Sequence, residues 1–392
     1  MLTGVTRQMV NLWTDSKHHG EAYYIGRKVN LVDERLKEIS PPSEIHRAPR
    51  SLLERKCWKA SERRAFLFYS LIILQGILPP IYLNNFFLYV YGIYTLVGDS
   101  ISSDSIALSE ACLTKFVIQL EELYGLSHCT FNVHCLTHLA QCVKDCGPLW
   151  ATSAFVFESH NHVLLNMFNG TQCVPQQITD RFLLKNKIAS LARSCINDEA
   201  SPSVRDTLSR FTDVAKFEHV NDGLTRLGSE KYVTLDVHRI LAIQDLLNVD
   251  VVNRSGIMYD RFIYSHKLYS STTYIRSKRH SNHSICFEHA SFTYGIIVGL
   301  VEIKPSCQCS PDILQDCICM RHNVVLVKPM IVNHRMLFRD CDFSVTSKFI
   351  AQVEETGSVI AIFPFQIKRK CICVALGNVM YFCSLPYRIY GD

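Results

Sequence analysis

Apolar residues recur at three- and four-residue spacing through most of the first half of the chain, which is the period of an α-helix with one buried face. The segments VTRQMVNLW and VNLVDERLKEI show this pattern, and Pro41-Pro42 ends the second of them. Further helices are expected on both sides of Pro79-Pro80 and over SSDSIALSEACLTKFVIQLEELYG, FNVHCLTHLAQCVKDCG and SAFVFESHNHVLLNMFNG. The first half is therefore predicted to be mainly helical.

The pattern changes after about residue 195. The segment INDEASPSVRDTLSRFTD is polar and is typical of a linker. Short β-branched and aromatic runs follow it, namely KYVTLDV, TYGIIVGLVEI, NVVLVKPMIV, SVIAIFPFQI and CICVALGNVMYFCSL. We therefore predict an α+β chain with a helical domain over residues 1–195, a linker over 196–229 and a β-rich domain over 230–392.

Residues 65–98, AFLFYSLIILQGILPPIYLNNFFLYVYGIYTLVG, are the most apolar stretch of the chain. Pro79-Pro80 divides this stretch, and Gln75 and Asn85 lie close to the break. Such residues are costly in hydrocarbon, and neither half reaches the roughly 20 apolar residues that a membrane span needs. We therefore expect two buried core helices here and no membrane partner.

Cysteine is abundant, with 17 in 392 residues. The chain starts MLTGVTRQMVNLWTDSKHHG, without the charged and then apolar leader of a secreted protein. Because the chain is also long for a disulfide scaffold, we expect reduced thiols in a nuclear or otherwise cytoplasmic protein that is not secreted. The formal net charge of +5 is informative only through its distribution along the chain.

The segment HRAPRSLLERKCWKASERR, residues 46–64, carries seven basic residues against two glutamates, a surplus equal to the net charge of the whole chain. Such a segment can contact several phosphates, with Trp58 available for stacking. The alternative is a solvated helix face with internal ion pairs. The candidate DNA-binding residues are Arg47, Arg50, Lys56, Lys59, Arg63 and Arg64.

Glu158 is an isolated acid in the apolar and aromatic run LWATSAFVFESHNHVLLNMFNG. On a helix, Asn161 and His162 would lie on the same side as Glu158, and this arrangement suits a divalent-metal ligand in a cleft. The alternative is a solvent-facing glutamate. His134 and His138 stand one helical turn apart and form a second candidate metal site, although buried structural histidines would show the same spacing.

The pairs Cys307-Gln-Cys309 and Cys317-Ile-Cys319 are a third candidate metal site, for zinc. Their one-residue gaps are tighter than the two- to four-residue gaps of ordinary structural zinc sites. A cysteine-rich loop without a metal is therefore the favoured interpretation.

Several separated segments, in this order, resemble the C-terminal part of CACTA-type (En/Spm-like) transposases of animal genomes. The resemblance is strong over roughly residues 1–190 and looser beyond them. It is carried by LTGVTRQMVNLWTDSKHH, ISPPSEIHRAPRSLLERKCWKASE, ILPPIYLNNFFLYVYGIYTL, FNVHCLTHLAQCVKDCGPLWATSAFVFE and FNGTQCVPQQI.

The resemblance implies a ribonuclease H-like catalytic domain, in which three carboxylates hold two Mg²⁺ ions for strand cleavage and transfer. The helical half would then be the insertion and last helix of that core, with Glu158 as the third acid. In the family the second aspartate stands just before the segment matched by LTGVTRQMVNLW, so both aspartates are expected to be missing here. Relatives carry Asn-Gly where this chain has Asn161 followed by His162.

A single carboxylate does not hold two metal ions, so the resemblance implies a truncated, transposon-derived protein that is inactive alone. DNA binding and assembly with a complete transposase or with a second copy are the expected interactions. The alternative function is a protein–protein interaction module without a DNA or catalytic role.

Overall fold

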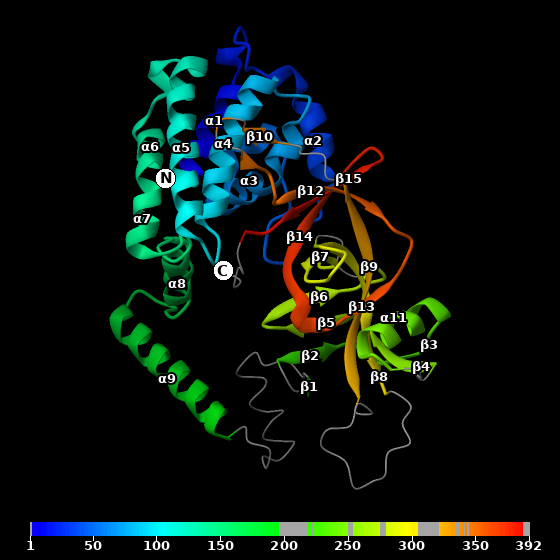
Figure 1. Ribbon diagram of the computed structural model, residues 1–392. Coiled ribbons are helices and arrows are strands. Elements are labelled where there is room, and N and C mark those ends of the chain that lie inside the picture. Colours follow the sequence, from blue (N-terminus) through cyan, green and yellow to red (C-terminus); the bar gives the residue numbers. More distant parts are fainter. Residues whose placement is uncertain are drawn as a thin grey trace. The chain divides into compact units, whose positions relative to one another are not determined.

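The computed structural model describes residues 2–195, 218–220, 223–249, 254–274, 280–304, 321–333, 338–340, 342 and 345–386 (Figure 1). Two compact units are present. The first combines Met1–Thr152 with Gly228–Tyr390, and the second contains Ser153–Leu227 together with Gly391–Asp392. The helices up to Thr152 and the strands after Gly228 therefore belong to one unit, whereas the domain boundaries near residues 195 and 230 stay predictions from the sequence pattern.

The helical part of the first unit follows the predicted pattern closely. Its elements are α1 (Leu2–Thr14), η1 (Ser16–His18), η2 (Gly26–Lys28), α2 (Val29–Lys37), η3 (Leu52–Cys57), α3 (Ala60–Leu74), α4 (Pro80–Leu96), α5 (Ser103–Tyr124), η4 (Leu126–His128), α6 (Phe131–His134), η5 (Cys135–His138) and α7 (Leu139–Cys146). Ser102 caps α5 by accepting a hydrogen bond from the Ser105 amide, and Gly125 ends it with a φ of 92°.

The prediction of one continuous helix over FNVHCLTHLAQCVKDCG is wrong. The segment divides into α6, the 3-10 turn η5 and α7. The Thr137 hydroxyl donates to the His134 carbonyl at 2.8 Å. This local bond competes with the regular helical ladder and favours the tighter turn.

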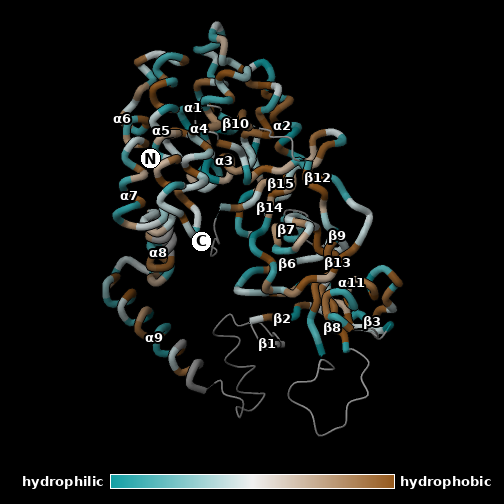
Figure 2. The backbone as a smooth tube through the Cα atoms, viewed as in Figure 1, coloured by the Kyte–Doolittle hydropathy of each residue, from teal (hydrophilic) through white to brown (hydrophobic). Residues whose placement is uncertain are grey.

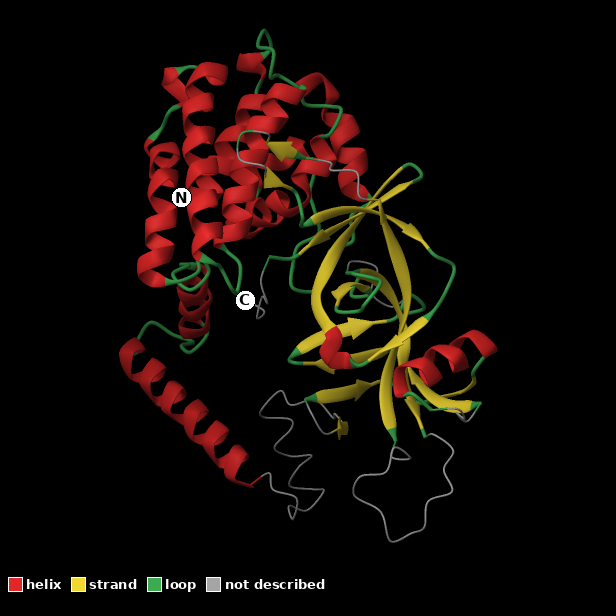
Figure 3. Cartoon of the chain, viewed as in Figure 1, coloured by secondary structure: helices red, strands yellow, loops and turns green. Residues whose placement is uncertain are grey.

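The strands of the sheet-rich part of the first unit are drawn in yellow in Figure 3, and its helical segments in red. Its elements are β3 (Lys231–Thr234), α11 (Val237–Leu247), β4 (Ser255–Tyr259), β5 (Arg261–Tyr264), β6 (Lys267–Ser270), β7 (Ser284–Phe287), β8 (Tyr294–Ile303), β9 (His322–Asn333), β10 (Arg339–Asp340), β11 (Val345–Thr346), β12 (Ile350–Glu355), β13 (Ile360–Ile362), η6 (Pro364–Gln366), β14 (Ile367–Leu376) and β15 (Val379–Ser384). The coarse prediction of an α+β chain is confirmed, whereas the ribonuclease H-like core stays a prediction.

Six of these strands close on themselves through antiparallel pairs. The pairing runs β9, β12, β15, β14, β7, β8 and back to β9. Strand β8 is buried at every position, and the tube around its label has the hydrophobic colour in Figure 2. The predicted strand over SVIAIFPFQI is shorter, because Pro364 lacks the amide that would continue the ladder and begins η6 instead.

The outer face of β14 and β15 packs against the helices. Ile372 and Val374 share the large hydrophobic core with the helical part, whereas Cys371 and Phe382 belong to a separate cluster on the other side of the two strands. This alternation is the two-residue period of a strand that is buried on both faces. The Tyr94 ring stacks on Phe349 at 4.0 Å, which joins α4 to the loop before β12.

Helices α3 and α4 are the two apolar helices that Pro79-Pro80 was expected to separate, and both supply the buried core. Over the described ranges, none of the helices combines the length and the apolar composition that crossing a membrane requires.

The second unit contains α8 (Phe155–Leu165), α9 (Val174–Cys195) and the antiparallel pair β1 (Glu218–Val220) with β2 (Leu224–Leu227). Helix α8 ends at Leu165 rather than at Gly170, where the sequence pattern placed its end. The sequence pattern also predicts a packed stripe of Phe157, Leu164 and Phe168 on this helix, whereas the Phe157 side chain is 68% exposed. The prediction of a packed Phe157 is therefore wrong.

Candidate functional site

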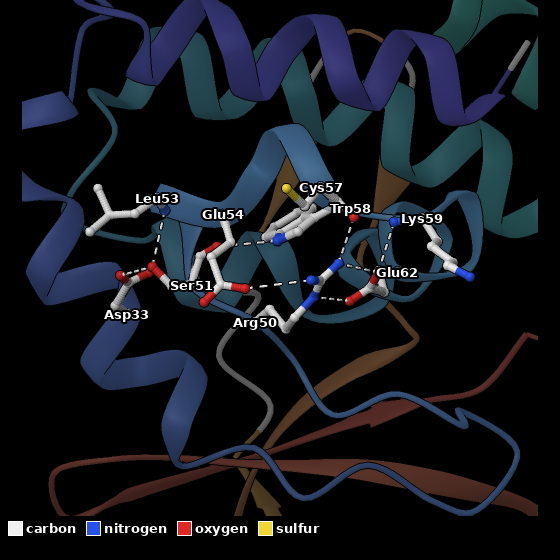
Figure 4. Close-up of polar contacts among 9 residues, drawn as sticks. All are labelled: Asp33, Arg50, Ser51, Leu53, Glu54, Cys57, Trp58, Lys59 and Glu62. Carbon is white, nitrogen blue, oxygen red and sulfur yellow. Dashed lines mark hydrogen bonds and ion pairs between the residues drawn. The ribbon is translucent and has the colours of Figure 1, made fainter.

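Arg50 lies between both glutamates of the basic segment (Figure 4). Its Nε and Nη2 donate to the two carboxylate oxygens of Glu62 at 2.6 and 2.8 Å. Its Nη1 lies 3.4 Å from a Glu54 oxygen, and Nη2 also donates to the Cys57 carbonyl at 2.7 Å. The guanidinium is thus occupied by protein acceptors on three sides.

This arrangement fixes the start of α3. Glu62 is buried, and one of its oxygens also accepts the Lys59 amide at 2.7 Å, which satisfies the first turn of the helix. Burial alone raises the pKa of Glu62, but the bonds from Arg50 and from the Lys59 amide outweigh burial and lower that pKa. The ion pairs give Arg50 a structural role at the start of α3, and its contact with DNA stays a prediction from the sequence.

The expectation that Trp58 offers an exposed ring is also wrong. The indole is 6% exposed, and its ring lies against Phe66 with the centroids 5.4 Å apart. Its Nε1 donates to the Ser51 carbonyl at 3.1 Å. Burial of a large aromatic ring stabilises the fold, and apolar residues near the start of α3 surround the Trp58 ring.

Arg50 makes the ion pairs of both glutamates, so the other bases of the segment lie outside these pairs. Arg47, Lys56 and Lys59 are exposed, while Arg63 and Arg64 are half-buried. The ammonium of Lys59 points away from the Arg50 cluster in Figure 4. Five of the six predicted DNA-binding residues thus lie outside the Arg50 ion-pair cluster.

Helix α1 and η1 add two cations that the basic segment does not contain. Arg7 lies near Arg63, whose pKa is lowered by burial first and by the charge of Arg7 second. Lys17 follows Asp15, whose pKa is lowered by a hydrogen bond from the Lys17 amide and further by the charges of Lys17 and Lys56. Arg7 and Lys17 line one cavity. The cations near Arg63 and those near Asp15 therefore lie on one stretch of surface.

We call the resulting surface the basic face. It consists of Arg7 and Arg63, of Lys17 and Lys56 near Asp15, and of Lys59, which is exposed at the N-cap of α3. The sequence reasoning missed Arg7 and Lys17, which lie far from residues 46–64 along the chain. The sequence signal for Arg7 was the helical period of the first helix. Val5 and Met9 lie on its buried face, whereas Arg7, between them in the sequence, lies on its polar face.

His134 and His138 come together as their spacing predicts. Their Nε2 atoms are 3.3 Å apart, and both side chains are exposed rather than buried in a core. Cys142 is exposed on α7. Within the described part of the chain, no group of three or more His, Cys, Asp or Glu side chains is placed to hold a metal ion.

The side chains of the other predicted metal ligands lie outside the described residues. Glu158 lies in α8, but its side chain and that of His162 are outside the described residues. The same holds for Cys307, Cys309, Cys317 and Cys319, which fall in 305–320. The Mg²⁺ and zinc sites therefore stay predictions from the sequence, and no cleavage step is derived through them.

Comparison of the chain with models of protein families, with curated proteins and with solved structures gives no match.

Proposed function

We propose that this chain is a transposon-derived, nuclear DNA-binding protein that contacts the phosphate backbone through its basic face. The observation that carries the proposal is the exposure of Arg7, Lys17, Lys56 and Lys59, which lie outside the ion pairs of Arg50 with Glu54 and Glu62. The sequence resemblance to CACTA-type transposases supports DNA as the polyanion. A complete transposase or a second copy is the candidate assembly partner, and the proposal contains no cleavage step by this chain alone.

Backbone contact explains the chemistry of the basic face. Each lysine or arginine that neutralises a phosphate releases a condensed counterion, and this gain does not depend on base sequence. The exposed ammonium groups of Lys56 and Lys59 are point charges suited to such contacts. The buried Trp58 ring does not stack on an unpaired base, and duplex DNA of any sequence is the ligand that backbone contact predicts.

The test is the salt dependence of binding to a duplex of arbitrary sequence. The variant carries Lys56→Ala and Lys59→Ala, and the matched control carries Lys328→Ala and Lys348→Ala, two exposed lysines of the sheet-rich part. Loss of two phosphate contacts should reduce the slope of log affinity against log salt by about two. The control should keep the slope of the unmodified protein.

An affinity that does not change with salt would reject the proposal and favour the alternative of a protein-binding module. If the Lys56 and Lys59 variant keeps the full slope, these two lysines do not contact phosphates. That outcome rejects the basic face as the DNA-binding surface, whereas DNA binding itself would stand.

A further inference from the structure

A cavity of about 330 Å³ lies against the exposed side of α1, within the basic face. Arg7, Gln8 and Asn11 reach it from one side of the helix, since residues three and four apart are neighbours there. Lys17 and His18 reach it from η1, and His128 lines it from the end of η4. The lining contains four basic side chains and neither aspartate nor glutamate. Its volume is at the lower end of the range of small-ligand pockets.

The walls of the cavity are fixed by hydrogen bonds. The Gln8 amide donates to the His128 carbonyl at 2.6 Å, and the Thr130 hydroxyl donates to the Gln8 oxygen at 2.8 Å. These two bonds hold the segment after α5 against α1, although the two lie far apart in the sequence. The Tyr23 hydroxyl lies 3.4 Å from His18 Nδ1, which leaves the other ring nitrogen for a ligand. The site is therefore preformed rather than assembled by a loop closure.

The charge of the cavity is positive and is only partly balanced. In the described part of the chain, the side chains of Arg7 and Lys17 have no ion-pair partner. Burial lowers the pKa of His18 first, and the charges of Lys17 and His128 lower it further, against the smaller opposing effects of Asp15 and Glu21. An anion placed between these groups would remove the repulsion among them.

We propose that this cavity binds a dianionic phosphate monoester. The Arg7 guanidinium offers the planar fork that matches a phosphate oxygen pair, and Lys17 supplies a second fixed charge. Asn11 adds a neutral amide donor, and the His18 and His128 rings meet edge to face with their centroids 5.7 Å apart. Two fixed cations and two imidazoles suit the double negative charge of a monoester better than the single charge of a carboxylate or a phosphodiester.

The inference rests on the proposed DNA-binding function for the source of the ligand, which would be the phosphorylated end of a DNA strand lying along the basic face. A free phosphate monoester has the same chemistry. The experiment therefore uses three probes with the full chain: a short duplex with phosphorylated strand ends, the same duplex with hydroxyl ends, and inorganic phosphate.

We expect the phosphorylated duplex to bind roughly tenfold more tightly than the hydroxyl duplex, which is the effect of one good charge-assisted interaction. Arg7→Gln should abolish this preference. Arg7→Lys keeps the charge and should keep the salt dependence while losing most of the preference, because the fork is gone. Lys328→Gln, an exposed change on β9, is the control and should retain the preference. Thermal unfolding of each variant verifies that it is folded.

The outcomes separate this inference from the function that it extends. Equal binding of the two duplexes, with no binding of inorganic phosphate, overturns the phosphate site and leaves the DNA-binding proposal intact. Binding of inorganic phosphate that is weakened by Arg7→Gln, with neither duplex bound, supports the site for a free phosphate monoester and overturns DNA binding. A preference that persists in Arg7→Gln also overturns the site.

Discussion

The ammonium of Lys370 on β14 lies 2.8 Å from the carboxylate of Glu44 in the segment between α2 and η3, and the two side chains are 1% and 8% exposed. Asn282 Oδ1 accepts a further bond from the same ammonium at 2.9 Å, and the Tyr269 ring lies 5.1 Å from it. Burial lowers the pKa of Lys370, although the charge and hydrogen bond of Glu44 oppose this effect. The pair is a buried link between the helical and sheet-rich parts of the first unit.

Removing one member of this pair should destabilise the protein strongly. We expect Glu44→Gln to lower the free energy of unfolding by about 3 kcal/mol, because an uncompensated charge then stays buried. Lys370→Met combined with Glu44→Gln should recover much of that loss, since no buried charge remains. Denaturant unfolding of the single and double variants checks this. A double variant that is less stable than Glu44→Gln alone would contradict the explanation.

Arg50→Ala should lower stability rather than DNA affinity. The change leaves Glu62, 6% exposed in its side chain, with the hydrogen bond from the Lys59 amide, so a loss of about 2 kcal/mol is expected. Lys59→Ala removes only an exposed side chain and should change the free energy of unfolding by less than about 0.5 kcal/mol. Thermal and denaturant unfolding compare the two variants. The slope of log affinity for duplex DNA against log salt should change more in Lys59→Ala than in Arg50→Ala.

The stability of the protein should rise with pH up to about 6.5, partly through His283. Burial lowers the pKa of His283 below its ordinary value of 6.5, so the unfolded chain binds the proton more readily. Stability that is present above pH 6.5 is therefore lost as the pH falls towards the folded-state pKa. His283→Gln should flatten this part of the profile. His18, whose pKa is also lowered, contributes with the same sign and remains as background in both proteins.

Gly92 is required for the close approach of α4 and α5. A Cβ at this position would lie 2.6 Å from Leu113 Cγ. Gly92→Ala should therefore destabilise by about 1 kcal/mol, since overpacking costs more than the better helix propensity of alanine returns. Gly20→Ala is the control, because nothing lies within 4 Å of its added Cβ. Equal unfolding midpoints for the two variants would show that α5 shifts without cost.

Much of the fold follows from local signals in the sequence. Ser102 and Gly125 bound α5 as expected because a cap and a left-handed stop act within one turn. Runs of β-branched and aromatic residues likewise located β8, β9 and the segment that contains β14 and β15. The 3-10 turn at Cys135–His138 was missed because a single side-chain hydrogen bond decides it. Helix α11, inside the sheet-rich part, was missed among the short runs that read as strands.

The candidate site was less predictable because charges pair through space. The count of basic residues in 46–64 gave Arg50 and Lys56 equal weight. In the structure Arg50 pairs with two glutamates, whereas Lys56 is exposed. Arg7 and Lys17 join the same surface only after α1 packs beside η3 and α3. Closure of the sheet through β8 and β9 is likewise a long-range pairing that no local pattern specifies.

The large hydrophobic core has consequences for synthesis on the ribosome. Residues of α4 share it with Ile372, Cys383 and Leu385, and the Tyr94 hydroxyl donates to the Ser384 carbonyl. A nascent chain therefore exposes its most apolar helices until nearly the whole polypeptide has emerged. Because exposed apolar surface favours aggregation, we expect a chain that stalls before β15 to aggregate rather than to form a smaller folded product.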